Sequence, residues 1–359
     1  MIPDNVISTP DQVTARWLTD VLTKSGALDT GAVESFNLDT NRRELSTNVR
    51  LELKYTDGAR GEMPRNLFLK MVNIDMEDEF FGPSEVTYYI RDYGGVPDVP
   101  ILRCYDAAYS ESLGRYHVLL DDLSATHVPS YERTPTLEFG LALADGLAAM
   151  HAHWWGRDRL EQAGEPIPTA DQINRFVSIA RPGVEPILRG CADQLEPHWP
   201  GVICELYEKH PPLMINRTQD GNGFTLIHGD TNRANILVPI EGDRPIYLID
   251  RQPFDWSLTT WLGVYDLSYN LVLKWDAAIR RECEIPILKH YHERLIAKGV
   301  RGYSWEQLWY DYRLSAVMSV YVATEWCRGG LNRETLPLWL PMLQKSMIAF
   351  DNLDCGSLW

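Results

Sequence analysis

Residues 226–238 read LIHGDTNRANILV. An apolar run leads into His-Gly-Asp, Asn235 follows Asp230 by five positions, and a second apolar run begins at once. A third apolar run, PIYLID, ends on Asp250. Short apolar runs bounded by Gly, Asp and Asn predict strands that are joined by tight turns. We therefore predict a hairpin over residues 226–250, in which the last strand returns Asp250 to the loop that carries Asp230 and Asn235.

The three polar side chains of this stretch suit one kind of chemistry. Asn235 and Asp250 offer the oxygen ligands that Mg²⁺ takes alongside substrate phosphates. Asp230, next to them, can accept a proton from an attacking hydroxyl, which completes a set for phosphoryl transfer. Asp and Asn also favour tight turns, so the alternative is that Asp230 and Asn235 only shape a loop.

The first 120 residues predict an antiparallel sheet with few helices. The segment STPDQVTARWLTDVLTKSG opens with Thr9, Pro10 and Gln12 at capping positions and predicts a helix that Gly26 ends. A short helix is predicted from about Glu85 to the DYGG segment. Strands are predicted over residues 33–40, 47–56, 65–72, 101–109 and 115–123.

Beyond Asp122 the pattern becomes helical. Apolar residues recur at helical spacing after residue 136. Further helices are predicted over residues 170–181, 194–209, 264–298 with breaks, 304–327 and 335–352. The prediction is an α+β, two-lobed chain: residues 1–120 form a small antiparallel sheet lobe, and residues 121–359 form a larger, mainly helical lobe that holds the 226–250 hairpin.

Composition excludes several classes of protein. The 34 basic and 50 acidic residues give a net charge of −16, which disfavours nucleic acid and anionic membrane as partners. No apolar run approaches the roughly 20 residues that span a bilayer. The N-terminus does not resemble a signal peptide. The six cysteines are scattered without a C-x-x-C pair, as in a cytoplasmic protein with reduced thiols.

The order of these residues resembles a known group of enzymes. The spacing D-x-x-x-x-N matches the catalytic loop of protein kinases, but Gly229 stands for the arginine of H-R-D, and Arg251-Gln252 stand for the Phe-Gly of D-F-G. HGD with a later Asn and a later ID.Q, together with a helix ending LAAMHAHWW and a DL near position 266, resembles the aminoglycoside phosphotransferase and choline kinase-like superfamily. IDRQ and EVTYY look most like its ecdysteroid-kinase-like branch. The resemblance covers about residues 35 to 330.

The resemblance implies a role for each site residue. Asp230 would be the catalytic base, Asn235 and Asp250 the magnesium ligands, and His228 a brace for the loop. Lys70 would contact the phosphates of the nucleotide and pair with Glu85. The remaining implied roles are phosphate capping by Ser46, Thr47 and Asn48, adenine binding by backbone at Leu120, Asp121 and Asp122, and fastening of the catalytic loop by Asp266.

Purely structural roles remain as alternative interpretations of these residues. Lys70 could be an exposed lysine on an edge strand. Glu85 competes with Glu77 and Glu79, and it also suits the first turn of a helix. Asp266 could be an N-cap. The four histidines His151, His153, His290 and His292 are read as packing or surface residues, because pairs spaced by two do not share a helix face.

The predicted function is an O-phosphotransferase that moves the γ-phosphate of ATP, or of GTP, to a hydroxyl of a small molecule with Mg²⁺. Acceptors from aminoglycosides to amino alcohols and other alcohols remain open, as does a monomer or a dimer. One rival is a catalytically silent nucleotide-binding protein on the same fold. A protein kinase is the second rival, and it is disfavoured because only fifteen residues separate Asp250 from Asp266.

Overall fold

The computed structural model describes residues 5–43, 45–72 and 81–359. The chain forms two compact units. Unit 1 consists of Met1–Pro97, Ile101–Val128 and Pro239–Asp255, and unit 2 consists of Asp98–Pro100, Pro129–Val238 and Trp256–Trp359. The chain crosses between the units five times: on either side of Asp98–Pro100, within the short strands β8 (His127–Pro129) and β10 (Ile236–Pro239), and after Asp255.

Unit 1 is built on a five-stranded antiparallel sheet of order β2-β3-β5-β7-β6. Its strands lie where the sequence predicts them: β2 (Val33–Arg42), β3 (Ser46–Tyr55), β5 (Asn66–Val72), β6 (Cys104–Ser110) and β7 (Arg115–Asp121). The alternation along β3 turns Val49, Leu51 and Leu53 to the buried face. Two shorter strands, β1 (Leu28–Thr30) and β4 (Arg60–Gly61), form a separate pair.

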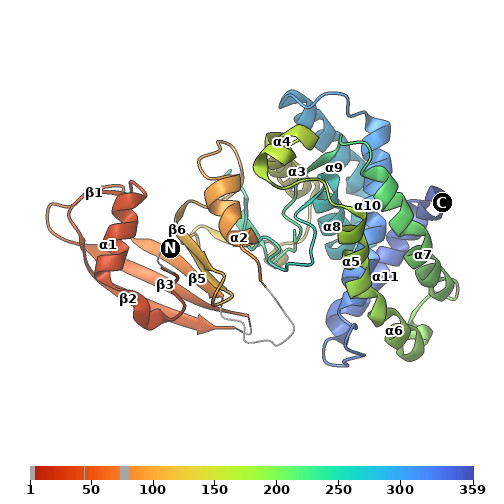
Figure 1. Ribbon diagram of the computed structural model, residues 1–359, viewed down its shortest axis with the longest axis horizontal. Coiled ribbons are helices and arrows are strands. Elements are labelled where there is room, and N and C mark those ends of the chain that lie inside the picture. Colours follow the sequence, from red (N-terminus) through yellow and green to blue (C-terminus); the bar gives the residue numbers. More distant parts are fainter. Residues whose placement is uncertain (1–4, 44, 73–80) are drawn as a thin grey trace. The chain divides into compact units, whose positions relative to one another are not determined.

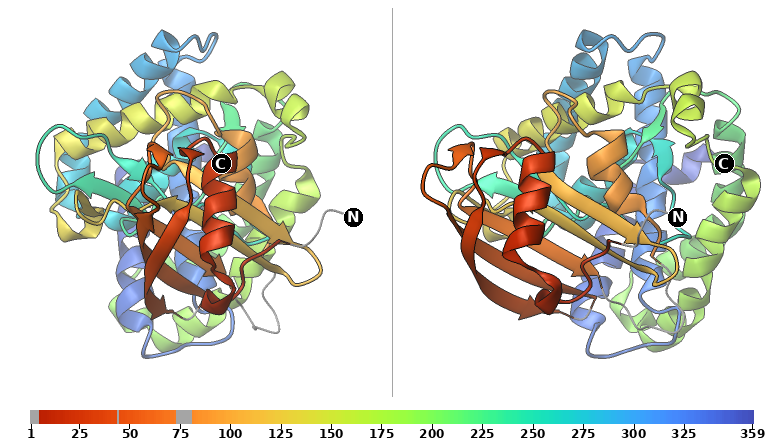
Figure 2. Two further views of the ribbon diagram at one scale, coloured as in Figure 1. Left: turned by 90° about the vertical axis from the view of Figure 1, so that its left-hand side faces the viewer. Right: turned by 60° about the vertical axis from the view of Figure 1, so that its left-hand side comes forward.

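Helix α1 (Ala15–Lys24) covers one face of this sheet, as Figures 1 and 2 show. Leu18, Val21 and Leu22 join the buried residues of the strands in one apolar cluster. The helix begins later than predicted, because Thr14 accepts the hydrogen bond of Trp17 N and is the N-cap. The predicted capping box at Thr9 instead closes the short 3-10 turn η1 (Pro10–Gln12).

Two further elements of unit 1 carry residues of the predicted site. The predicted short helix is α2 (Ser84–Thr87), which continues into a π-helical turn, η2 (Tyr88–Asp92). Strand β11 (Tyr247–Leu248) lies just before Asp250. The Tyr88 hydroxyl lies 3.5 Å from the carbonyl oxygen of Leu248, so η2 lies against the end of β11.

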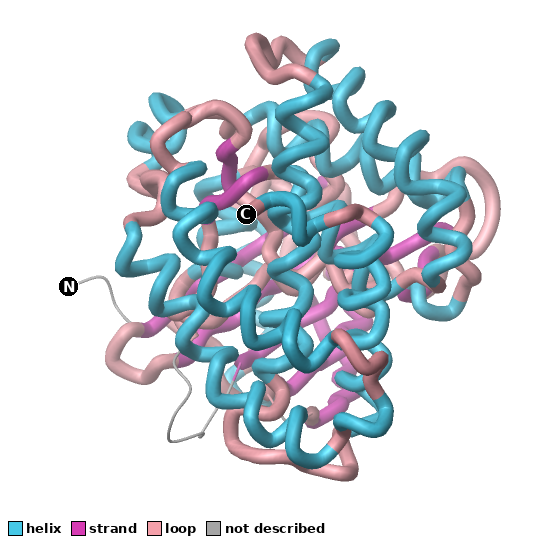
Figure 3. Tube along the Cα trace, turned by 90° about the vertical axis from the view of Figure 1, so that its right-hand side faces the viewer, coloured by secondary structure: helices cyan, strands magenta, loops and turns pink. Residues whose placement is uncertain are grey.

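Unit 2 is mainly helical, and its helices are drawn in cyan in Figure 3. Helix α3 (Leu137–His153) packs on α9 (Ala277–Ala297), and the two approach so closely that a Cβ at Gly140 would lie 2.2 Å from Ile287 Cδ1. Helix α8 is buried all round, between its neighbours α10 and α11. The other helices are α4 (Arg157–Ala163), α5 (Ala170–Ala180), α6 (Val184–Gly190), α7 (Trp199–Arg217), α8 (Val264–Lys274), α10 (Trp305–Glu325) and α11 (Leu336–Asn352).

The predicted 226–250 hairpin is confirmed for its last two strands, because β10 pairs with β11, and it is wrong for its first strand. Strand β9 (Phe224–Leu226) pairs antiparallel with β12 (Thr260–Leu262), not with the strand that follows it in the chain. Leu226 lies opposite Thr260, and all three residues of each strand are buried. The loop after β9 is therefore anchored at its start by a strand that lies beyond Asp250 in sequence.

Among the helices that the structure describes, none is long and apolar enough to cross a membrane.

Candidate active site

The loop that follows β9 carries Asp230 and Asn235 in direct contact. Asn235 Nδ2 donates to Asp230 Oδ2 over 3.0 Å and to the Asp230 carbonyl oxygen over 3.1 Å. His228 Nδ1 accepts a hydrogen bond of 3.3 Å from Asp230 N. Gly229 has a φ of +80°, a backbone conformation that side chains with a Cβ rarely adopt. The spacing of five positions thus gives a closed loop in which an amide nitrogen orients the carboxylate.

Asp266 fastens this loop from helix α8. Its Oδ2 accepts a hydrogen bond of 2.7 Å from His228 N, and its Oδ1 accepts one of 2.9 Å from Gly229 N. Thr231 Oγ1 donates to the Asp266 carbonyl oxygen over 2.6 Å. The N-cap position of α8 belongs to Gly263, so the Asp266 carboxylate serves the loop rather than the helix end. These bonds involve both backbone N–H groups that precede Asp230.

Sequence reasoning did not find the partner of Asp266. His151, on α3, is fully buried, with Nε2 3.1 Å from Asp266 Oδ2 and Nδ1 2.7 Å from the Tyr291 hydroxyl. Because a carboxylate only accepts, Nε2 carries the proton and donates to Asp266. The reading of His151 as a packing residue omitted this bond. The available signal was a histidine on the buried face of α3, three and four residues after Ala148 and Leu147.

The charge of the buried Asp266 is stabilised by these donors. Burial raises the pKa of a carboxyl group, but the hydrogen bond and charge of His151, with the charge of His228 and the N–H of Gly229, lower the pKa of Asp266 below its ordinary value. Asp266 is therefore a charged anchor.

The Asp230 carboxylate has one unused acceptor. Among the described residues, none forms a hydrogen bond with the buried Asp230 Oδ1. Burial raises the pKa of the Tyr269 phenol of α8, and the charge of Asp230 and a side-chain hydrogen bond with it add to the rise. Burial also raises the pKa of Tyr265, and the charges of Asp266 and Asp230 add to that rise. A buried acceptor without a donor costs free energy, which a hydroxyl ligand would recover.

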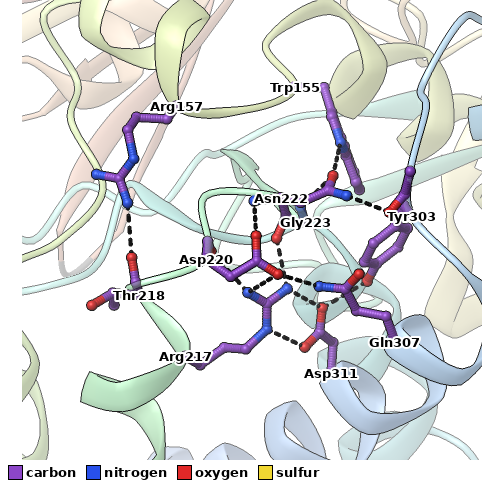
Figure 4. A network of polar contacts seen from close by, with 11 residues as sticks. Trp155, Arg157, Arg217, Thr218, Asp220, Asn222, Gly223, Tyr303, Gln307 and Asp311 are labelled. Atoms are coloured by element: carbon purple, nitrogen blue, oxygen red, sulfur yellow. Dashed lines mark hydrogen bonds and ion pairs between the residues drawn. The ribbon is translucent and has the colours of Figure 1, made fainter.

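A second network holds β9 and so the start of the loop (Figure 4). Arg217, at the end of α7, pairs with the buried Asp311 of α10 through Nε–Oδ1 and Nη2–Oδ2 contacts of 2.7 and 2.8 Å. The Tyr303 hydroxyl donates to Asp311, and Arg217 Nη2 also donates to the Asn222 carbonyl oxygen over 2.6 Å. A Cβ at Gly223 would lie 2.8 Å from Arg217 Nη2. The backbone entering β9 is thus held against a buried ion pair, which the sequence did not indicate.

Unit 1 brings together Lys70, Glu85 and Asp250. Lys70 Nζ, from β5, lies 2.8 Å from both Glu85 Oε2 and Asp250 Oδ1. The Tyr116 hydroxyl donates to Glu85 Oε2, while the buried Glu85 Oε1 has no partner among the described residues. β5 lies between β3 and β7 in the sheet, so Lys70 is not on an edge strand. Glu77 and Glu79, the other candidates for its partner, lie outside the described residues.

The three charged side chains of this triad lie in different environments. Burial opposes the charge on Lys70, but Asp250 and Glu85 together raise the pKa of the ammonium group above its ordinary value. Burial raises the pKa of Glu85, and Lys70 only partly offsets the rise. The Glu85 side chain is 1% exposed and that of Asp250 is 43% exposed. Asp250 also has a φ of +58°, so its backbone is strained where its side chain is accessible.

The segment after Asp250 is fixed by another ion pair that the sequence did not reveal. Arg251 Nη1 donates to Asp92 Oδ2 over 2.6 Å, and both side chains are buried. The Arg251 guanidinium also lies 5.8 Å from the centroid of the Tyr88 ring. Arg251 stands where protein kinases have phenylalanine. Its ion pair with Asp92 joins the segment after Asp250 to the π-helical turn.

The predicted nucleotide contacts lie on strands of unit 1. Thr47 and Asn48 pair with both neighbouring strands, whereas Ser46 lies opposite Val72 of β5. Asn48 lies opposite Lys70 in the register of β3 with β5. The residues predicted to hold adenine end β7: Leu120 is buried, Asp121 Oδ1 accepts a hydrogen bond from the Tyr105 hydroxyl, and Asp122 Oδ1 accepts one from Ser124 N. The roles of these six residues stay predictions.

The predicted magnesium ligands, Asn235 of unit 2 and Asp250 of unit 1, each offer an oxygen donor. Among the described residues, no three His, Cys, Asp or Glu side chains gather as a metal-binding group. One amide oxygen from Asn235 and one carboxylate from Asp250 are the small, all-oxygen set that Mg²⁺ accepts with water and phosphate. Asn235 directs its amide nitrogen to Asp230, which turns its oxygen to the opposite side. The proposed ligand pair therefore suits Mg²⁺ in chemistry.

Solved structures of known proteins resemble this chain, although no family model and no curated protein sequence matches it. An ethanolamine kinase from Plasmodium vivax superposes with a TM-score of 0.53 at 11% sequence identity, over 89% of this chain and 82% of that one. The spectinomycin phosphotransferase APH(9)-Ia, in complex with ADP and spectinomycin, superposes with a TM-score of 0.52 at 11% identity, over 96% and 99%.

The chain has the fold of these small-molecule kinases. The α+β prediction, with a small antiparallel sheet and a larger helical part, is confirmed. The likeness covers most of the chain, 89% of it in the first comparison and 96% in the second. The ecdysteroid-kinase-like branch stays a prediction.

Proposed function

We propose that the protein is an ATP-dependent O-phosphotransferase that moves the γ-phosphate to a hydroxyl of a small molecule, with GTP as the alternative donor. The observation that carries the proposal is the Asp230 loop. A carboxylate with one buried, unpartnered oxygen is oriented by Asn235, and the two backbone N–H groups before it are held by Asp266. Such a group is placed to receive a proton.

In the proposed reaction, Asp230 accepts the proton of the acceptor hydroxyl as that oxygen attacks the γ-phosphorus. A new P–O bond forms, the bond between the γ-phosphorus and the bridging oxygen breaks, and ADP leaves with the electron pair. Direct transfer needs no phospho-enzyme. When bound, Mg²⁺ held by Asn235 and Asp250 would neutralise charge on the phosphates. Lys70, kept charged by Glu85 and Asp250, would contact the phosphates of the nucleotide.

The known activities of similar structures indicate the first acceptors to try. One of the two acts on ethanolamine, and the other is a spectinomycin phosphotransferase seen with ADP. We infer from them that amino alcohols and antibiotics belong in the test, together with sugars, hydroxy acids and lipophilic alcohols. Asp230 and its loop carry no feature that selects among these acceptors.

The test is a screen for acceptor-dependent release of ADP, with ATP or GTP and Mg²⁺, followed by detection of the phosphorylated acceptor. We expect at least one acceptor to raise ADP release well above the rate without acceptor. Stabilisation by ATP and Mg²⁺ without turnover on any acceptor would favour the catalytically silent nucleotide-binding protein. Radiolabel that appears on protein but on no small molecule would favour a protein kinase.

A further inference from the structure

Three cationic side chains of unit 2 lie within electrostatic reach of one another. They are Arg233 of the loop itself, Lys274 at the end of α8 and Lys345 of α11, here called the basic cluster. The charges of Arg233 and Lys345 both act on Lys274, and so does the charge of Asp230. Arg233 also acts on Lys345. The cluster therefore combines residues from three elements, and Lys274 is the member on which the charge of the proposed catalytic base acts.

Lys274 lies in an environment that does not match its charge. Its Nζ lies 3.1 Å from Met342 Sδ and 6.0 Å from the centroid of the Tyr269 ring. Among the described residues, no carboxylate forms an ion pair with it. Burial lowers the pKa of Lys274; Asp230 opposes this shift, and Lys345 and Arg233 add to it. A partly buried ammonium group with sulfur and aromatic neighbours costs free energy unless an anion binds to it.

Lys345 extends the same surface. It lies three residues after Met342 on α11, so both side chains are on one face of that helix, the face that touches Lys274. Burial lowers the pKa of Lys345, Asp276 opposes the shift and Arg233 adds to it. Within the described part of the chain, no ion pair joins Lys345 to an acid.

Arg233 is held in place by neutral acceptors. Its Nη2 donates to the carbonyl oxygens of Ser130, over 2.6 Å, and of Arg133. Its buried Nε has no partner among the described residues. Burial lowers the pKa of Arg233 as well. The guanidinium is thus fixed by backbone and retains a donor that an oxyanion could use.

The acids nearest the cluster have other partners. The carboxylate of Asp276 accepts the hydrogen bond of Ala278 N and caps α9. Glu325, which acts on Tyr269, pairs with Arg328 over 3.1 Å, and burial raises its pKa. Asp230 is bound by Asn235. None of these acids forms an ion pair with the cluster in the described residues, so the three cations lack direct neutralisation.

We propose that the acceptor is a hydroxyl-bearing anion whose carboxylate or phosphate group binds the basic cluster while its hydroxyl meets Asp230. This inference rests on the proposed phosphotransferase and specifies its substrate class. An oxyanion there would neutralise Lys274 and Lys345 and supply an acceptor for Arg233 Nε. It would also place the hydroxyl beside the unpartnered Asp230 Oδ1. The net charge of −16 makes a local set of unpaired cations more selective, because the remaining surface repels anions.

The first arm of the test uses matched acceptors that differ in charge. Glycerate is compared with glycerol, glucose 6-phosphate with glucose, and 3-hydroxybutyrate with 1,3-butanediol, with ethanolamine as the cationic member. We expect acceptor-dependent ADP release from anionic members only. Turnover of the neutral members or ethanolamine with no turnover of the anions would overturn this inference and leave the proposed function standing.

The second arm uses K274M and K345M, with K209M at an exposed site of α7 as the matched control. Loss of one charge-assisted hydrogen bond should raise the KM for the anionic acceptor about ten- to a hundredfold. We expect the KM for ATP to stay within about twofold, and K209M to behave like the wild type. Equal rises in the KM for ATP would assign the cluster to the nucleotide phosphates and overturn the proposal. An equal loss of kcat on every acceptor, without a change in KM, would also overturn it.

The third arm needs no turnover. Calorimetric titration with glycerate, glucose 6-phosphate and inorganic phosphate should detect binding to the wild type and K209M, and much weaker binding to K274M and K345M. Neither variant should melt below the wild type, because methionine removes an unpaired, partly buried charge. If no tested acceptor releases ADP, the proposed function fails, and this titration still decides whether the cluster binds oxyanions. Equal binding by all four proteins, or binding by none, would contradict the inference.

Discussion

Two buried carboxylates support the proposed site, and their surroundings differ. Asp266 in unit 2 accepts hydrogen bonds from two backbone N–H groups and His151, and its pKa is lowered. Glu85 in unit 1 accepts hydrogen bonds from Lys70 and Tyr116 at one oxygen, and its pKa is raised because burial outweighs them. Burial is nearly equal, so the number and kind of donors decide the sign.

The comparison separates two ways of holding a site. Asp266 depends on backbone donors that are present whenever unit 2 is folded, so the Asp230 loop is set without a ligand. Glu85 depends on one lysine, and that lysine also pairs with Asp250, which is 43% exposed and strained. A ligand that binds Asp250 or Lys70 therefore changes the electrostatics of Glu85, whereas no such route leads to Asp266. We infer that Glu85 responds to a bound nucleotide more than Asp266 does.

The largest effect is expected from removing the cation of unit 1. K70M leaves Glu85 buried without a counter-ion, which should lower the free energy of unfolding by about 3–5 kcal/mol at pH 7. The loss should shrink as pH falls toward the unfolded pKa of Glu, about 4.3. Glu85 has a raised pKa in the folded state, so the folded chain is most stable when Glu85 is protonated. Chemical denaturation at pH 7 and pH 5 measures both effects.

The matched variants for this prediction are K54M, at an exposed site of β3, and the double variant K70M/E85Q. K54M should match the wild type. The double variant should recover most of the stability, because it removes the unpaired charge. A K70M loss that is the same at both pH values, with no recovery in the double variant, would mean that Glu85 is not the cause.

Asp266→Asn is expected to have the next largest effect. The amide keeps one acceptor, so either His228 N or Gly229 N loses its partner, and the charge is lost as well. The free energy of unfolding should fall by about 2–3 kcal/mol, and kcat should fall because the Asp230 loop loosens. Amide hydrogen exchange should show faster exchange at residues 228 and 229. Unchanged exchange at these two amides would remove Asp266 from its anchoring role.

His210 provides a pH-dependent contrast within unit 2. It hydrogen-bonds to the Tyr321 hydroxyl and to the Leu314 carbonyl oxygen, and burial lowers its pKa to about 3. The unfolded chain binds the proton more tightly, so stability is complete above the ordinary pKa of about 6.5 and is lost as pH falls toward 3. Between pH 7 and pH 5 this group should account for about 2 kcal/mol of the loss.

Denaturation of the wild type and H210Q at these two pH values checks this assignment. Glutamine has a side-chain amide that can donate to Leu314, but it does not titrate. H210Q should lose about 2 kcal/mol less than the wild type as pH falls. Parallel losses would show that His210 is protonated to the same degree in both states.

The smallest effect is expected from His151→Phe. The ring remains, but Asp266 loses one donor of three and the Tyr291 hydroxyl loses its partner. A loss of about 1–2 kcal/mol follows from unmade buried hydrogen bonds. Thermal denaturation should place H151F between the wild type and D266N. A variant that is less stable than D266N would make His151, not the backbone donors, the main support of the loop.

The fold could be predicted where local pattern decides it. The five strands of unit 1 follow from alternation and turn residues, and the α8-to-α11 region follows from helical spacing. Boundaries were less exact: the predicted helix over residues 194–209 is Trp199–Arg217, which continues through Pro211 and Pro212. The short helices Arg157–Ala163 and Val184–Gly190 were not predicted, because seven residues carry little periodic signal.

The candidate site could be predicted only where its residues lie in one segment. Asp230 and Asn235 are five positions apart, and the structure places them in contact. The supports of that loop come from distant elements. Strand β12 pairs with β9 from 36 residues beyond. His151 of α3 supports the loop through Asp266, and Asp311 of α10 supports the entry to β9 through Arg217. These contacts depend on how helices pack, which one sequence does not encode in its spacing. The nucleotide contacts at Ser46, Thr47 and Asn48 stay predictions on paired strand residues.

The measurement that tests the central claim most directly compares Asp230→Asn with the wild type on an accepted substrate. Single-turnover transfer from ATP and the dissociation constant of the ATP and Mg²⁺ complex are measured side by side, with D158N at an exposed site of α4 as the control. The account predicts that D230N transfers phosphate about 10²–10⁴-fold more slowly while its nucleotide affinity is unchanged. Transfer by D230N at the rate of the wild type and D158N would contradict it.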